Sequence, residues 1–125
     1  MNAPTTTWTA GPFDYERLEV TNVARETLRL VTKMARTLPR GNANLADQMT
    51  RAIQSAWLQM AEGAGRRGAD ARNRYRGAKS EAGEAAACVE AARIQELVRD
   101  EEAQHVRELL ARQCAMLTRL ANLAR

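Results

Sequence analysis

Apolar residues recur at steps of three and four along almost the whole chain, and this spacing limits the possible folds more than any other feature. Such steps place the apolar side chains on one face of an α-helix. Only 3 prolines and 7 glycines occur in 125 residues, and most of them lie between the periodic stretches. Because these two residue types disfavour helices most strongly, the sequence predicts an all-α protein.

Four helices follow from the positions of the periodic stretches and of the breaks between them. Leu38-Pro39 ends the first, because the residue before a proline is pushed out of the helical conformation. Asn44 is the predicted cap of the second helix, and Gly63 and Gly65 end it. Short connections favour antiparallel neighbours and therefore an up-down-up-down four-helix bundle. The predicted helices cover about 14–37, 45–62, 70–98 and 100–125.

The same spacing predicts which side chains form the core. Aromatic residues make up only 4% of the chain, so small and aliphatic side chains must fill the core and helices can approach closely. Gly77 and Gly83 are expected to mark such close contacts. A small bundle with little apolar area per helix gains from burying more of it against sister subunits, which favours a homo-oligomer. The predicted inner faces are Val20, Ala24, Thr27, Val31, Met34 and Leu38; Leu45, Met49, Ile53, Ala56 and Met60; Tyr75, Ala78, Ala82, Ala86, Val89 and Leu97; and Val106, Leu109, Leu110, Gln113, Leu117, Leu120 and Leu123.

Residues 1–12 differ from the rest of the chain. They are rich in threonine, contain two prolines and show no period, so we expect a flexible tail followed by one bundle domain over 13–125. The N-terminus lacks the apolar core of a secretion signal, and no stretch approaches the roughly 18 apolar residues of a membrane span. Cys88 and Cys114 are isolated and show no CxxC spacing. Buried thiols in a soluble cytoplasmic protein are the interpretation that this favours.

The sequence offers little for catalysis. Glu102 and His105 have the Glu-x-x-His spacing of di-iron bundles, but such sites need this motif on two helices and the chain has 1 histidine. A solvated surface pair is the favoured interpretation. No serine or cysteine has a histidine base in its pattern, and no glycine-rich phosphate loop follows a strand. We expect neither a metal nor a cofactor, and no enzymatic activity.

A cluster of basic residues is the strongest functional signal. The net charge of +4 is modest, but the surplus is concentrated within fourteen residues in the middle of the chain, where only Asp70 opposes it. Arginines near helix ends form charge-assisted contacts with phosphates, and Tyr75 adds a ring able to stack on a base. A solvated helix connection is the alternative. The candidate nucleic-acid-binding residues are Arg66, Arg67, Arg72, Arg74, Arg76 and Lys79.

The second predicted helix also carries a polar stripe. Gln48, Ser55, Gln59 and Glu62 follow one another at steps of seven, four and three, which aligns them beside the apolar face. Glu62 falls in the last turn, where the helix dipole disfavours an anion unless a cation answers it. Arg51, Arg66 or an arginine of the third helix can supply that charge. We interpret the stripe as a structural hydrogen-bond network between helices or subunits, with a solvated face as the alternative.

Trp57 lies away from this polar stripe, toward the outer edge of the apolar face of the same helix. Large aromatic side chains in such positions commonly anchor protein interfaces. Trp57 is therefore the candidate interface residue.

The order of motifs resembles the four-helix bundle protein family, which is also called the ribosomal-RNA intervening-sequence protein family. The resemblance covers about residues 13–124, and its most specific part is the Ala-Glu-Gly-x-Gly-Arg run. Members are encoded within intervening sequences of large-subunit ribosomal RNA genes or elsewhere in bacterial genomes. The motifs that carry it are Phe13, Leu18 and Val20; Leu38-Pro39; Asp47-Gln48-x-x-Arg51-Ala52-x-x-Ser55; Ala61-Glu62-Gly63-x-Gly65-Arg66; and a tyrosine leading to Ala78 and Glu84.

The resemblance implies a small up-down bundle that assembles as a homopentamer without catalytic activity. A related group, the accessory variability determinant of diversity-generating retroelements, is a basic pentamer that binds a reverse transcriptase and nucleic acid. Two departures from the family pattern fall in the polar positions between the second and third helices: Gln59 replaces an asparagine, and Ser80-Glu81 replaces a Gly-Ser pair. The family motif carries over at Ser55, Glu62, Gly63, Gly65, Arg66 and Glu84.

Two functional hypotheses follow. In the first, the oligomer associates with RNA, such as ribosomal RNA, through the basic turn and the third helix. In the second, it is a structural adaptor that docks a protein partner such as a reverse transcriptase.

Overall fold

The computed structural model describes residues 11–125, and within this range it contains four α-helices and one short 3-10 helix but no strand. The prediction of an all-α protein with four helices is confirmed. Most of the expected tail, residues 1–10, lies outside the described residues. The elements are η1 (Asp14–Arg17), α1 (Val20–Arg36), α2 (Ala43–Ala64), α3 (Gly68–Ile94) and α4 (Asp100–Leu123).

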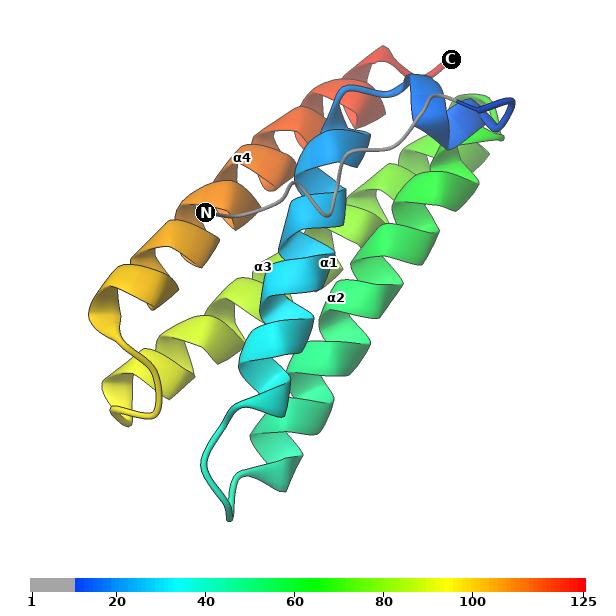
Figure 1. Cartoon of the computed structure of the whole chain (residues 1–125). Coiled ribbons are helices and arrows are strands. Elements are labelled where there is room, and N and C mark those ends of the chain that lie inside the picture. Colours follow the sequence, from blue (N-terminus) through cyan, green and yellow to red (C-terminus); the bar gives the residue numbers. More distant parts are fainter. Residues whose placement is uncertain (1–10) are drawn as a thin grey trace.

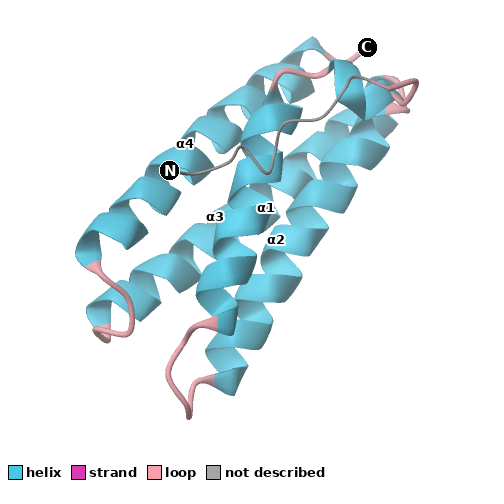
Figure 2. Ribbon diagram, in the orientation of Figure 1, coloured by secondary structure: helices cyan, strands magenta, loops and turns pink. Residues whose placement is uncertain are grey.

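The four α-helices lie side by side in an elongated bundle (Figure 1). Each helix packs against two others, because α1 contacts α2 and α4, and α3 contacts α2 and α4. The turns from α1 to α2 and from α3 to α4 lie at one end of the bundle, and the turn from α2 to α3 lies at the other (Figure 2). No helix among the described residues is long and apolar enough to cross a membrane.

Side chains from all four helices fill the interior in two adjoining clusters. The cluster toward the α1–α2 turn includes Val31, Ile53, Val89 and Leu110, none of which exposes more than 1% of its surface. The cluster toward the α2–α3 turn is built around Met60, Ala78 and Leu117. Alanines line much of α3, so that its neighbours approach closely. Most of the predicted inner-face residues are buried.

Two features of the core are polar or ionisable. The Thr27 hydroxyl of α1 donates a hydrogen bond to Gln113 Oε1 of α4 over 2.5 Å, and both side chains are buried. This pairing satisfies the amide oxygen inside the core. Burial raises the pKa of the Cys88 thiol, with a further contribution from the charge of Glu84. Burial also raises the pKa of Cys114. Both thiols are therefore protonated at neutral pH, as expected of unreactive cysteines.

Several helix ends differ from their predicted positions. Residues 14–17 form the separate η1, because extended backbone at Leu18 interrupts the expected first helix. Asn44 is not a cap: α2 begins at Ala43 after Asn42, whose side chain donates to the Pro39 carbonyl over 2.9 Å. The third helix ends at Ile94 rather than near residue 98. The chain turns there with a positive φ of 60° at Glu96, which places Leu97 in a turn instead of on a helix face.

Three side-chain predictions are also corrected. Leu123 is 68% exposed, because it is the last residue of α4 and extends beyond its neighbours. Ala85 rather than Ala86 is fully buried in α3, and Ala86 is half-buried. Gly83 is exposed, and a Cβ there would meet no atom within 4 Å apart from its chain neighbours and the backbone of its own helix. Gly77 does mark a close contact, since a Cβ there would overlap Oε1 of Gln59 on α2.

Candidate nucleic-acid interface

The α2–α3 turn places the predicted basic residues at one end of the bundle. Helix α2 ends at Ala64, and α3 starts at Gly68 with a positive φ of 58°. Residues other than glycine rarely adopt that conformation, so Gly68 allows the chain to reverse within a few residues. The sharp reversal brings the start of α3 alongside the end of α2. Cations on the two helices therefore lie near one another.

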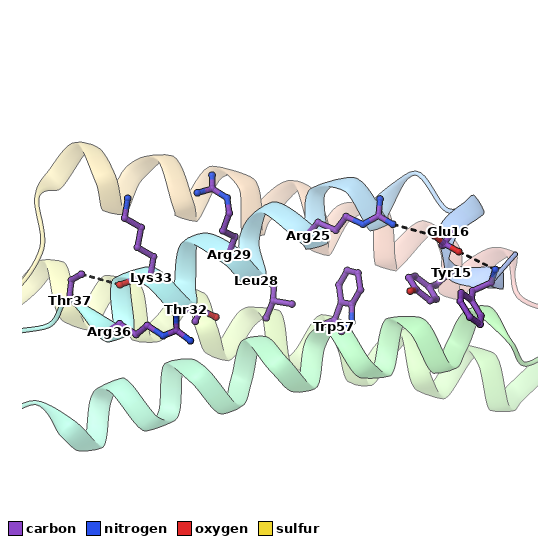
Figure 3. A pocket seen from close by; sticks show the side chains of 11 residues that line it. Tyr15, Glu16, Arg25, Leu28, Arg29, Thr32, Lys33, Arg36, Thr37 and Trp57 are labelled. Atoms are coloured by element: carbon purple, nitrogen blue, oxygen red, sulfur yellow. Dashed lines mark hydrogen bonds and ion pairs between the residues drawn. The ribbon is translucent and has the colours of Figure 1, made fainter. Parts of the chain in front are cut away.

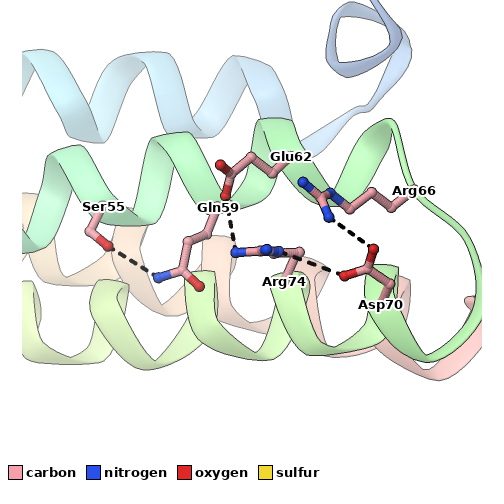
Figure 4. A network of polar contacts seen from close by, with 6 residues as sticks. All are labelled: Ser55, Gln59, Glu62, Arg66, Asp70 and Arg74. Atoms are coloured by element: carbon pink, nitrogen blue, oxygen red, sulfur yellow. Dashed lines mark hydrogen bonds and ion pairs between the residues drawn. The ribbon is translucent and has the colours of Figure 1, made fainter.

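Part of the basic cluster is neutralised within the chain (Figure 4). Arg66 Nη1 lies 2.9 Å from Asp70 Oδ2, and Arg74 Nε lies 3.8 Å from the other carboxylate oxygen. The hydrogen bond to Asp70 and its charge raise the pKa of Arg66 above its ordinary value. Arg74 Nη1 also lies 3.5 Å from Glu62 Oε1, which links α3 to α2. All these side chains are at least 38% exposed, so solvent screens the ion pairs and they add little to stability.

The remaining predicted cations have different surroundings. Arg72 Nη1 donates to the carbonyl of Ala124 over 3.3 Å and so holds the end of the chain after α4 against α3. Arg67, Arg76 and Lys79 are exposed, and within residues 11–125 the structure gives their side chains no ion pair. These three side chains are thus the cations most accessible to an external anion.

Tyr75 does not contribute to this surface. Its ring is only 6% exposed and packs against Gly63, where a Cβ would lie 2.8 Å from the ring. Burial raises the pKa of its hydroxyl. The prediction that Tyr75 can stack on a base is therefore wrong for this conformation. The position of Tyr75 in the 3.6-residue apolar pattern correctly predicted that its side chain lies on the inner face of α3.

The structure brings together only part of the predicted polar network. Gln59 Nε2 donates to Ser55 Oγ over 3.1 Å, and the Gln59 side chain lies over Gly77 of α3. Glu62 is joined to Arg74, as described above. Gln48, Arg51 and Glu84 are exposed and make no hydrogen bond to these residues within the described part of the chain. Whether the whole set forms a network across subunits remains a prediction.

Trp57 lies in a groove that the sequence patterns did not reveal (Figure 3). Its ring is half-buried and meets Tyr15 of η1 edge to face, with ring centroids 5.6 Å apart. The groove between η1, α1 and α2 has a volume of about 830 Å³. Tyr15, Leu28 and Trp57 supply its apolar surface, and we call it the basic groove because Arg25, Arg29, Lys33 and Arg36 of α1 also line it.

Two ion pairs hold the wall of the basic groove. Glu16 Oε2 lies 3.9 Å from Arg25 Nη2, and Glu26 pairs with Arg29. Lys33 and Arg36 are exposed and have no ion pair among the described residues. One signal for this surface was present in the sequence, since the four cations follow one another at steps of four, four and three, which aligns them on one helical face.

No group of three or more potential metal ligands comes together among residues 11–125. Glu102 and His105 lie on the surface of α4 at half-buried and exposed positions. The fold and these surfaces thus define an all-α four-helix protein whose distinctive features are a basic helix connection and a basic groove.

Comparison with known families agrees with this class. The family model described as 23S rRNA-intervening sequence protein matches residues 16–119, which is most of the chain. The chain therefore belongs to the 23S rRNA-intervening sequence protein family, as the sequence motifs predicted. No curated protein matches the chain.

Proposed function

We propose that this protein is a non-enzymatic RNA-binding module that assembles from several copies of the antiparallel, up-down-up-down bundle in the cytoplasm. The observation that carries the proposal is a group of exposed cations that have no ion pair within the described chain: Arg67 at the α2–α3 turn, and Arg76 and Lys79 in the first half of α3. Phosphates are natural partners for such side chains. Membership of a family named for the intervening sequences of 23S ribosomal RNA supports RNA over other polyanions.

Assembly supports the proposal, because a basic surface with low affinity for RNA can bind RNA tightly when several copies of it are displayed together. The family resemblance implies five copies, and a pentamer displays five basic turns. An RNA that reaches several of them binds with an effective concentration far above that of a single site. Arg66 and Arg74 remain partly exposed, at 40% and 38%, and can reorient from Asp70 toward a phosphate. Arg72 has a structural contact and contributes less.

A salt titration tests the RNA proposal. We expect the variant Arg67→Gln/Arg76→Gln/Lys79→Gln to bind a generic single-stranded RNA more weakly than the unmodified protein. Each phosphate contact on a single strand contributes about 0.7 to the slope of log affinity against log salt, so loss of three contacts reduces the slope by about 2. Fluorescence anisotropy at several salt concentrations measures both quantities, and circular dichroism verifies the helical content.

A matched control loses the same charge elsewhere. Arg99, Arg112 and Arg119 are exposed and lie at the start of α4 or along it. Their replacement by glutamine should leave most of the affinity and the slope unchanged. Equal losses in the two triple variants would show that binding depends only on net charge. The basic turn would then be a solvated connection, and the structural-adaptor hypothesis would take first place.

A further inference from the structure

The chain carries two surfaces that complement one another in shape, charge and apolar character. We infer that the basic groove of one copy receives, from a neighbouring copy, the exposed edge of α3 and its following turn. We call this edge the α3 ridge and define it by Glu84, Ala87, Ile94 and Glu96. The inference rests on the proposed homo-oligomer and names the two surfaces through which its copies meet.

The basic groove has the properties of an unfilled protein interface. Trp57 and Leu28 are only half-buried although they form its apolar surface, and aromatic side chains in concave sites are frequent anchors of protein association. The Nε of Arg29 is buried and has no hydrogen-bond partner among the described residues. A buried donor without a partner is costly, so a group from outside the described chain is expected to approach it.

The α3 ridge supplies the opposite surface. Ile94 is 71% exposed at the end of α3, which makes it the most exposed of the large apolar side chains among the described residues. Ala87 is exposed about two helical turns before Ile94, and Glu84 and Glu96 flank this stretch on the surface. An exposed isoleucine between acidic residues fits an aromatic groove with a basic wall.

Charge is divided between these two parts of the chain. Residues 25–40 contain five basic side chains and one acidic side chain, whereas residues 81–102 contain seven acidic and two basic ones. Within the described chain, the acidic segment forms ion pairs between Arg93 and Asp100 and between Glu90 and Arg107. Opposite net charges on separate segments attract between copies rather than cancel within one.

The positions of the two surfaces are compatible with a ring. Val31 and Met34, which flank Lys33 in α1, belong to the same core cluster as Ala85 and Val89 of α3. The end of the basic groove that Lys33 and Arg36 line therefore lies at a similar level along the bundle as the α3 ridge, whereas Trp57 packs against the other core cluster. A ring of more than two copies needs two different surfaces on each chain, so that each copy contacts the next in the same way. A groove on α1 and α2 with a ridge on α3 meets that requirement.

Charge reversal tests the contact. We expect Lys33→Glu/Arg36→Glu in the groove, or Glu84→Lys/Glu96→Lys in the ridge, to place like charges together and to raise the concentration for half-assembly at least about tenfold. The chain that carries all four changes restores opposite charges with their signs exchanged and should assemble again. Light scattering from about 1 to 100 micromolar gives the masses, and circular dichroism establishes that each variant is folded.

The control and the contradicting results are specific to this contact. Arg112→Glu/Arg119→Glu makes the same change of charge on exposed positions of α4 and should leave assembly unchanged. If the unmodified protein is a multimer but neither reversal weakens it, or the four-change chain stays apart while folded, the groove–ridge contact is wrong and the proposed oligomer stands. A monomeric unmodified protein of 13.9 kDa would overturn the oligomer as well. The affinity of one basic turn for RNA is measured separately and does not depend on either result, although the gain from linked turns requires the multimer.

Discussion

At the scale of single residues, Gly63 and Gly83 differ in whether the bundle has room for a side chain at their positions. Both lie inside helices, where replacement by alanine normally favours the helix by up to about 1 kcal/mol. A Cβ at Gly63 would lie 2.8 Å from the ring of Tyr75, which the core holds in place. At Gly83 the same atom would meet nothing within 4 Å. Only the first glycine is therefore required by packing.

We expect Gly63→Ala to lower the free energy of unfolding by about 1–2 kcal/mol, because the cost of overpacking exceeds the gain in helix propensity. Gly83→Ala should raise it by about 0.5–1 kcal/mol. Urea denaturation of the two variants and the unmodified protein measures both changes. Two changes of the same sign would contradict the packing that the structure shows at Gly63.

The sequence pattern predicted side-chain burial well where the 3.6-residue period decided it, and less well where local contacts did. Val31, Ile53 and Val89 repeat regularly and are buried as expected. Gly77 and Gly83 cannot be distinguished in this way, because their difference depends on whether Gln59 of α2 lies opposite. That is a property of two packed helices and not of either sequence segment alone.

At the scale of helices, the hydrogen bond between Thr27 and Gln113 joins α1 to α4 across the core. Thr27→Val leaves the buried Gln113 amide without its partner and should cost about 1–3 kcal/mol. The same change in a Gln113→Leu background should cost less, because no unsatisfied amide remains. A double-mutant cycle from chemical denaturation measures this coupling, and strictly additive costs would contradict the buried pairing.

Helix ends and the basic groove were the features least accessible from sequence. Asn44 was the predicted cap of α2, but Asn42 holds the N-cap position, where its side chain makes no capping hydrogen bond and contacts Pro39 instead. Tyr15 and Trp57 are 42 residues apart and meet only because extended backbone at Leu18 separates η1 from α1. No periodic pattern encodes that change of direction. The basic cluster could be located in the sequence, but its division into paired and accessible side chains depends on contacts that the fold creates, such as those of Arg74 with Glu62 and of Arg72 with Ala124.

At the scale of the whole molecule, we propose a bundle whose copies meet through the basic groove and the α3 ridge and present their basic turns together to RNA. The two charged surfaces then have separate roles. In this proposal the cations of α1 act between subunits, whereas Arg67, Arg76 and Lys79 face the RNA. Variants of the first group should weaken assembly and the gain in affinity for long RNA, and variants of the second group should weaken RNA binding while the protein still assembles.

The central claim is that several copies of the basic turn bind one RNA together. The dependence of affinity on RNA length tests this claim most directly, because a long RNA can reach several turns and a short RNA only one. An RNA of about 40 nucleotides that reaches several turns should bind at least about 100-fold more tightly than one of about 6 nucleotides, since linked sites gain from effective concentration. Anisotropy titrations at one fixed salt concentration give both affinities. In the Arg67→Gln/Arg76→Gln/Lys79→Gln variant, the affinity for the long RNA divided by that for the short RNA should fall to nearly the ratio of the two lengths. An affinity that grows only in proportion to length in the unmodified protein would contradict the account.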